Sequence, residues 1–158
     1  MLFPGIINCK YGGGGTGLTK AIVKGYTDIV DLLLSYQTID VNSCVYGARN
    51  DERLITPLML ACLAGREDIA QKLILAGANI NTKAPGANNI SAIAFAMVGG
   101  RESFIDLFME YEETDWNSLD NNGTSAAMEA VKRNQVETLK KLTRIPSINW
   151  NFRNNVEQ

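Results

Sequence analysis

The chain has 158 residues, of which 46% are apolar and 20% charged, and this balance indicates a soluble folded protein rather than a disordered one. Its 15 lysines and arginines against 17 aspartates and glutamates give a net charge of −2, so we expect no nucleic acid among its ligands. The sequence has no histidine, which removes the commonest general base and a favoured zinc ligand, so we expect neither an enzyme nor a cofactor.

Two further features concern the location of the protein. The sequence contains no apolar run approaching the roughly 20 residues that a membrane-spanning helix needs, so we expect no membrane insertion. Its three cysteines, Cys9, Cys44 and Cys62, are widely spaced and form no CxxC motif. Such a pattern favours reduced thiols over a disulfide framework, and we therefore expect a cytoplasmic protein.

One pattern recurs along the chain, first as TGLTKAIVKGYTDIVDLLL and then, aligned without a gap, as TPLMLACLAGREDIAQKLI. A third copy is SAIAFAMVGGRESFIDLFM, and a weaker fourth is SAAMEAVKRNQVETLKKLT. The four copies occupy residues 16–34, 56–74, 91–109 and 125–143. Recurrence of this kind indicates a stack of similar structural units.

Each copy predicts two helices separated by a sharp turn. The leading Thr or Ser, as at Thr16, suits a helix N-cap, and Pro57 suits the first helical position. Gly65 and its equivalents, with Asn134 in the fourth copy, suit the left-handed conformation that ends a short first helix of about two turns. Apolar residues at helical spacing then predict the second helix.

A second landmark follows each copy and consists of an acid or amide, an apolar residue and an asparagine. It occurs at residues 40–42, 79–81, 115–117 and 149–151. The polar, glycine-containing segment after it predicts a projecting β-turn finger. One such unit buries too few apolar side chains to fold alone, so neighbouring units must stack into a solenoid.

At this point the pattern resembles the ankyrin repeat. The best matches to its consensus are TPLMLACLAG at 56–65, AGANIN at 76–81 and DNNGTS at 120–125. The resemblance covers residues 6–153 and implies an all-α ankyrin-repeat solenoid of about four stacked helix-turn-helix repeats with β-turn fingers. We expect a single domain over 1–158, with repeats at about 11–42, 51–81, 86–117 and 120–151.

The chain departs from the consensus at several positions. The consensus histidine is replaced by Thr19, Met59, Ala94 and Met128. Residues 1–8 resemble the tail of a preceding unit, and the more polar last helix suits a cap that faces water. We expect Trp116 and Trp150, at the apolar turn position, to pack between neighbouring units.

Two segments invite a catalytic or ligand-binding interpretation. The glycine run at 12–17 precedes a helix, as in phosphate-binding loops, but Leu18-Thr19 follows it instead of Lys-Ser/Thr, which favours a finger over an anion site. Cys44 is a candidate nucleophile, but the chain has no histidine to activate it, so a bystander thiol is the better interpretation.

By resemblance, partners bind to the finger tips and the exposed side of the first helices, which form the concave face. Mapped onto this sequence, the partner-binding residues are Lys24, Glu52, Arg53, Ile55, Leu63, Ile90, Val98, Asn121, Asn122, Lys132 and Arg133. Their centre is apolar and their ends are basic, which is how many protein interfaces are built. The family also suggests hydroxylation of Asn42 and Asn81.

We therefore expect a non-catalytic protein-protein interaction module, a scaffold or adaptor that binds a protein partner as a monomer. The partner should offer an apolar patch flanked by acidic groups. The alternative is a targeting segment of a larger multidomain protein, or a secreted microbial effector, whose activity lies outside this chain.

Overall fold

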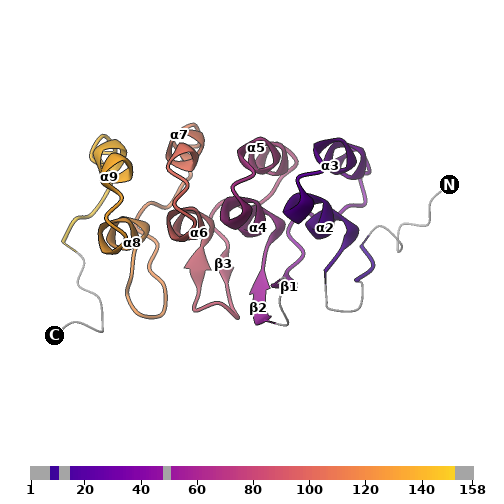
Figure 1. Cartoon of the computed structure of the whole chain (residues 1–158), viewed down its shortest axis with the longest axis horizontal. Coiled ribbons are helices and arrows are strands. Elements are labelled where there is room, and N and C mark those ends of the chain that lie inside the picture. Colours follow the sequence, from indigo (N-terminus) through magenta and orange to yellow (C-terminus); the bar gives the residue numbers. More distant parts are fainter. Residues whose placement is uncertain (1–7, 11–14, 48–50, 152–158) are drawn as a thin grey trace.

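The computed structural model describes residues 8–10, 15–47 and 51–151, with the backbone alone for 45–47 and 51–53. Among these described residues, four helix pairs stack side by side, and the two helices of each pair lie in two parallel rows (Figure 1). The inner row contains α2 (Gly17–Lys24), α4 (Pro57–Ala64), α6 (Ala92–Val98) and α8 (Ala126–Lys132). The outer row contains α3 (Thr27–Leu34), α5 (Glu67–Leu75), α7 (Ser103–Met109) and α9 (Val136–Leu142).

Fingers project from the inner row, on the side away from the outer one (Figure 1). One is an antiparallel pair of β1 (Val45–Gly47) and β2 (Asp51–Ile55), and another pairs β3 (Lys83–Ala84) with β4 (Ile90–Ser91). The ankyrin-type solenoid predicted from the sequence is thereby confirmed.

The predicted helix ends are also confirmed. The hydroxyl oxygens of Thr16, Thr56, Ser91 and Ser125 each accept a hydrogen bond from a backbone N–H in the first turn of an inner helix. Gly25, Gly65, Gly100 and Asn134 all have positive φ, between 55° and 72°. An asparagine tolerates this conformation better than most side chains, so the fourth repeat turns as the others do.

The residues at the consensus histidine position contribute to these caps. The side-chain oxygen of Thr19 accepts from the Thr16 N–H at 2.8 Å, and the Met59 sulfur accepts from the Thr56 N–H at 3.4 Å. Apolar packing between the rows supplies the core, in which Ile69, Leu73 and Phe108 are fully buried.

The asparagines of the first three D/N-x-N turns each link their own repeat to the next. Asn81 donates from Nδ2 to the Glu113 carbonyl at 2.6 Å, and its Oδ1 accepts from the Asp115 N–H at 2.8 Å. Asn8, Asn42 and Asn117 make the same pair of bonds one repeat along from themselves. We call this series the asparagine ladder. The position of Asn8 in it matches the tail of a preceding unit expected there, whose residues 1–7 lie outside the described part.

The two tryptophans differ, and the expectation for one of them is wrong. Trp116 is 8% exposed and packs between the third and fourth repeats, as predicted. Trp150, in the last D/N-x-N turn, is 48% exposed. The polar cap is likewise only partly formed, since Val131 and Val136 of the last repeat are 60% and 50% exposed.

Candidate functional site

The side chains that the inner helices and fingers turn to solvent form one surface, which we call the inner face. Leu63 on α4 lies near the middle of the inner face and is 40% exposed. Val98, on the neighbouring helix α6, is half-buried. Lys24 and Lys132 are exposed on the first and last inner helices. The inner face therefore has an apolar centre and a basic residue on each terminal helix.

Exposure of these residues follows from the packing of the same helices. On α4, Leu58, Ala61 and Cys62 are fully buried against the neighbouring helices, which leaves Leu63 on the remaining side. Leu63 is thus an apolar side chain that lies outside the hydrophobic core. Such residues are candidates for contact with a partner.

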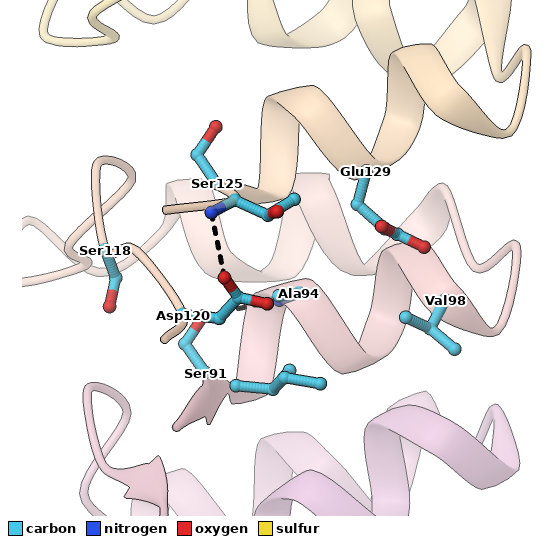
Figure 2. A pocket seen from close by; sticks show the side chains of 9 residues that line it. Ser91, Ala94, Val98, Ser118, Asp120, Ser125 and Glu129 are labelled. Carbon is cyan, nitrogen blue, oxygen red and sulfur yellow. Dashed lines mark hydrogen bonds between the residues drawn. The ribbon is translucent and has the colours of Figure 1, made fainter. Parts of the chain in front are cut away.

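A small, shallow pocket with a cavity volume of about 20 Å³ opens onto the inner face between α6 and α8 (Figure 2). Its apolar wall comes from Ile90, Ala94 and Val98. Its polar lining consists of Ser91, Ser118, Asp120, Thr124, Ser125 and Glu129. A small hollow with an apolar wall and a few fixed polar groups is a candidate point of contact on this face.

Asp120 fixes the finger at one side of this pocket. Its carboxylate accepts from the backbone N–H groups of Asn122 and Thr124, both at 2.8 Å, and the second bond is drawn in Figure 2. It also accepts from Asn88 Nδ2 at 3.0 Å, which ties the finger to the one before it. The finger is thus held in place before any partner arrives.

Glu129 is a pocket residue that the sequence analysis missed. It is only 9% exposed, and its Oε1 accepts from Arg133 Nε at 2.5 Å, one helical turn along α8. Leu60 and Phe95, at 6% and 5% exposed, occupy the same position in the second and third repeats. The first repeat has Lys20 at this position, so the available signal was a carboxylate where the second and third repeats are apolar. Because the carboxylate of Glu129 neutralises the charge of Arg133, the uncompensated positive charge at the α8 end of the inner face is that of Lys132.

Ten of the eleven predicted partner-binding residues fall into three groups, and the eleventh, Ile55, is buried. Exposed residues on the inner helices and the last finger are Lys24, Leu63, Asn121, Asn122, Lys132 and Arg133. Ile90 and Val98 are half-buried and line the pocket. The side chains of Glu52 and Arg53 lie outside the described part of the chain. Binding by any of these residues stays a prediction.

Ile55 is a correction. It was expected at the binding surface, but it is 4% exposed. It pairs with Val45 at the base of the finger and directly precedes the capping Thr56, so its side chain turns into the core rather than towards the tip.

Asn121, another predicted partner-binding residue, makes hydrogen bonds within the protein. Its N–H donates to the Asn88 carbonyl at 2.9 Å, and its Oδ1 accepts from Asn89 at 2.7 Å.

Asn42 and Asn81, the two residues suggested for hydroxylation, are both members of the asparagine ladder. Asn42 donates to the Gly77 carbonyl at 3.1 Å and accepts from the Asn79 N–H at 2.8 Å. Both are exposed despite these bonds. Their modification stays a prediction.

The cysteines differ in environment. Burial raises the pKa of the Cys62 thiol far above its ordinary value, with a backbone hydrogen bond opposing the shift, so this thiol stays protonated at neutral pH. Cys44 is half-buried and Cys9 exposed. Within the described ranges, no three side chains of His, Cys, Asp or Glu gather as a metal site requires.

Comparison with known proteins agrees with this architecture. A family model for ankyrin repeats (3 copies) matches residues 2–84 and 58–154. The chain belongs to the ankyrin-repeat family. Ankyrin repeats are a non-catalytic fold for protein-protein interaction.

Two curated relatives come from Caenorhabditis elegans. One is named poly [ADP-ribose] polymerase tankyrase, 36% identical over 78 residues, or 49% of this chain. The other is ankyrin repeat and KH domain-containing protein mask-1, 30% identical over 94 residues, or 60% of this chain. The match covers 3% of each relative, so it reports shared ankyrin repeats and carries over no activity of the whole protein.

Proposed function

We propose that this ankyrin-repeat chain is a protein-binding module that holds its partner on the inner face. The observation that carries the proposal is the exposed Leu63 beside the pocket lined by Ile90 and Val98, on helices whose opposite sides are buried. Apolar anchors that fill a preformed pocket dominate many protein interfaces.

The charges suggest the kind of partner. Lys24 and Lys132 are exposed on the terminal inner helices, so a partner with an apolar patch flanked by acidic groups fits the inner face best. The net charge of −2 gives no support to a nucleic acid partner.

The setting of the module is also a proposal. Among the described helices, none is long and apolar enough to cross a membrane. We propose a monomeric module in the cytoplasm that acts as a scaffold or adaptor. Because the match covers 3% of each relative, a role as the targeting segment of a larger protein is the second candidate.

The test compares two variants that change the same residue types on different surfaces. The inner-face variant carries Leu63→Glu and Lys132→Glu. The control carries Leu75→Glu and Lys140→Glu, at exposed positions on the outer helices α5 and α9. Circular dichroism must first show equal helix content for both.

Proteins captured from lysate by the wild-type chain are purified, and their binding to each variant is measured by calorimetry. We expect the inner-face variant to lose at least about tenfold in affinity, whereas the control retains it. Equal binding by the two variants would place the site elsewhere and refute the proposal.

A further inference from the structure

The pocket between α6 and α8 has a negatively charged polar side. Its lining contains two carboxylates, from Asp120 and Glu129, and no lysine or arginine. Hydroxyl groups supply the rest of the polar lining, and Ile90, Ala94 and Val98 form the apolar wall. The polar side therefore offers hydrogen-bond acceptors and negative charge, which together suit a positively charged group.

Asp120 keeps its charge without a cation beside it. The three N–H bonds that its carboxylate accepts come from two backbone amides and one side-chain amide, all of them neutral donors. In the described part of the chain, no lysine or arginine forms an ion pair with it. The ammonium group of Lys83 donates instead to the Leu119 carbonyl at 2.8 Å. Asp120 is thus held in position while its charge stays available to a cation from outside.

Glu129 has one carboxylate oxygen to spare. Arg133 Nε donates to Oε1, whereas Oε2 receives no hydrogen bond from the described residues. Arg133 is not among the residues that line the pocket, and its side chain is 42% exposed. One arginine charge outside the pocket therefore stands against two carboxylates within it, and the site keeps a net negative charge.

Ser118 gives a second, independent indication that the pocket receives a polar group. It is 8% exposed, and its buried Oγ has no hydrogen-bond partner among the described residues. The hydroxyls of Ser91 and Ser125, by contrast, each cap a helix. Ser118 lies at the finger end of the pocket, with Asp120 between it and Glu129 (Figure 2). Buried polar atoms without a partner are rare, and one that lines a pocket points to a bond made by a ligand.

The size of the pocket limits the group that enters it. Its volume of about 20 Å³ accommodates a group the size of a single water molecule. A primary ammonium group meets this limit, whereas the larger, planar guanidinium group of arginine does not. The ammonium group also carries only hydrogen-bond donors, which matches a lining rich in acceptors.

The apolar wall suits the remainder of a lysine side chain. Ala94 and Val98 lie on α6, across the pocket from Asp120 and Glu129 (Figure 2). A lysine lays its methylene stem along apolar surface and places its charged tip among polar groups. One lysine would therefore satisfy both halves of the lining at once.

We propose that the pocket between α6 and α8 binds the ammonium group of a lysine side chain of the protein partner. The stem lies on the α6 wall, and the ammonium group donates to the acceptors of Asp120, Ser118 and Glu129 Oε2. This inference rests on the proposed function, because it names one group of the partner that the inner face holds. The lysine adds a positive group to a partner whose acidic groups meet Lys24 and Lys132.

Nuclear magnetic resonance with small probes tests the pocket by itself. The probe is Nα-acetyl-lysine N-methylamide, added to the 158-residue chain at constant ionic strength. Its Nε-acetylated form, which is neutral, and the corresponding arginine compound are the matched controls. We expect the lysine probe to bind in the millimolar range or more weakly and to shift the amide signals of Ser118, Asp120 and Glu129.

The two control compounds should each bind at least about threefold more weakly than the lysine probe, one for lack of charge and the other for its size. Equal binding of the lysine probe and its neutral form would overturn the proposal, because charge would then play no part. A lysine probe that leaves these amide signals unmoved would overturn it as well.

Charge variants separate a ligand site from a purely structural ion pair. Glu129→Gln should weaken binding of the lysine probe at least about threefold, whereas Arg133→Met should strengthen it, because Arg133 competes for the same carboxylate. If Glu129 served only to hold Arg133, the two variants would act alike, and the proposal would fail. Glu137→Gln, which removes the carboxylate of an exposed ion pair on α9, is the matched control and should leave binding unchanged. Circular dichroism must show equal helix content for all three.

The partner purified for the inner-face test separates this inference from the proposed function. We expect Glu129→Gln to lower the affinity for that partner at least about threefold, and Glu137→Gln to leave it unchanged. A partner that binds Glu129→Gln as tightly as the wild type, but loses affinity for the Leu63→Glu/Lys132→Glu variant, would overturn the lysine pocket and leave the proposed function intact. Selective binding of the lysine probe, combined with full binding of the partner to the Leu63→Glu/Lys132→Glu variant, would refute the proposed function instead.

Discussion

The second repeat packs against a helix pair on each side, whereas the first packs against a helix pair on one side only among the described residues. Ile69 and Ile29 occupy the same position in these two repeats, yet Ile69 is fully buried and Ile29 is 46% exposed. The same residue in the same local fold thus has opposite environments. Burial in this molecule is a property of the stack, and stability should accordingly be concentrated in its middle.

The largest expected difference between the two repeats comes from truncating this isoleucine. Ile69→Ala removes methyl groups from a closed core and should lower the free energy of unfolding by about 2–5 kcal/mol. Ile29→Ala should cost less than about 1 kcal/mol, because its side chain already meets solvent. Urea denaturation measures both. Equal costs would mean that Ile29 is covered in solution and would break the comparison.

The turns within the repeats should show a smaller difference. Gly65 has φ 69°, and a Cβ atom there would lie 2.6 Å from Arg101 of the third repeat. Gly100 has φ 67°, but the nearest atom to its Cβ would be Gln135 Nε2 at 3.9 Å. We expect Gly100→Ala to cost about 1–2 kcal/mol from backbone strain alone, and Gly65→Ala to cost more because Arg101 must also move.

Thermal melts of the two alanine variants check this order. Arg101→Ala in the Gly65→Ala background should recover part of the difference, because it removes the atoms that clash with the new Cβ. Costs that are equal in the two variants would show that the arginine moves aside without penalty.

Substitutions in the asparagine ladder should change stability by a similar or smaller amount. Asn81 makes two bonds to the backbone of the third repeat, so Asn81→Ala should cost about 1–2 kcal/mol. Asn151 accepts and donates no ladder bond among the described residues, and Asn151→Ala should be nearly neutral. Chemical denaturation of both proteins measures the difference, and a large cost at Asn151 would show that this asparagine makes stabilising bonds like those of Asn81.

The ion pairs between repeats should contribute least to the free energy of unfolding. Lys141 pairs with Asp106 at 2.5 Å, and the two side chains are 27% and 62% exposed. Lys141→Met should cost about 0.2–1 kcal/mol, and salt at about 1 M should remove most of that cost by screening. Melting curves at low and high salt provide the measurement. A cost that is unchanged in high salt would assign the effect to packing of the lysine chain instead.

The features of the fold that were predicted correctly depend on residues close to one another in sequence. The caps at Thr16 and Ser125 and the left-handed Asn134 follow from local chemistry and recur with the repeat. The stacking of units follows because one helix pair cannot bury enough apolar surface alone.

What the sequence did not predict depends on contacts between repeats. Ile55 was expected on the surface because it belongs to a finger, but its pairing with Val45 turns it into the core. Glu129 was overlooked because its burial requires the pocket between α6 and α8. Trp150 was expected to be buried like Trp116 because the two occupy the same position of the D/N-x-N turn, but it is 48% exposed.

Hydrogen exchange read by mass spectrometry tests the contrast between middle and end most directly. It compares the amides of α5 with those of α3 under native conditions, and local stability sets the rate of each. We predict that α5 exchanges markedly more slowly than α3. Exchange of α3 as slow as that of α5 in the 158-residue chain would contradict the account.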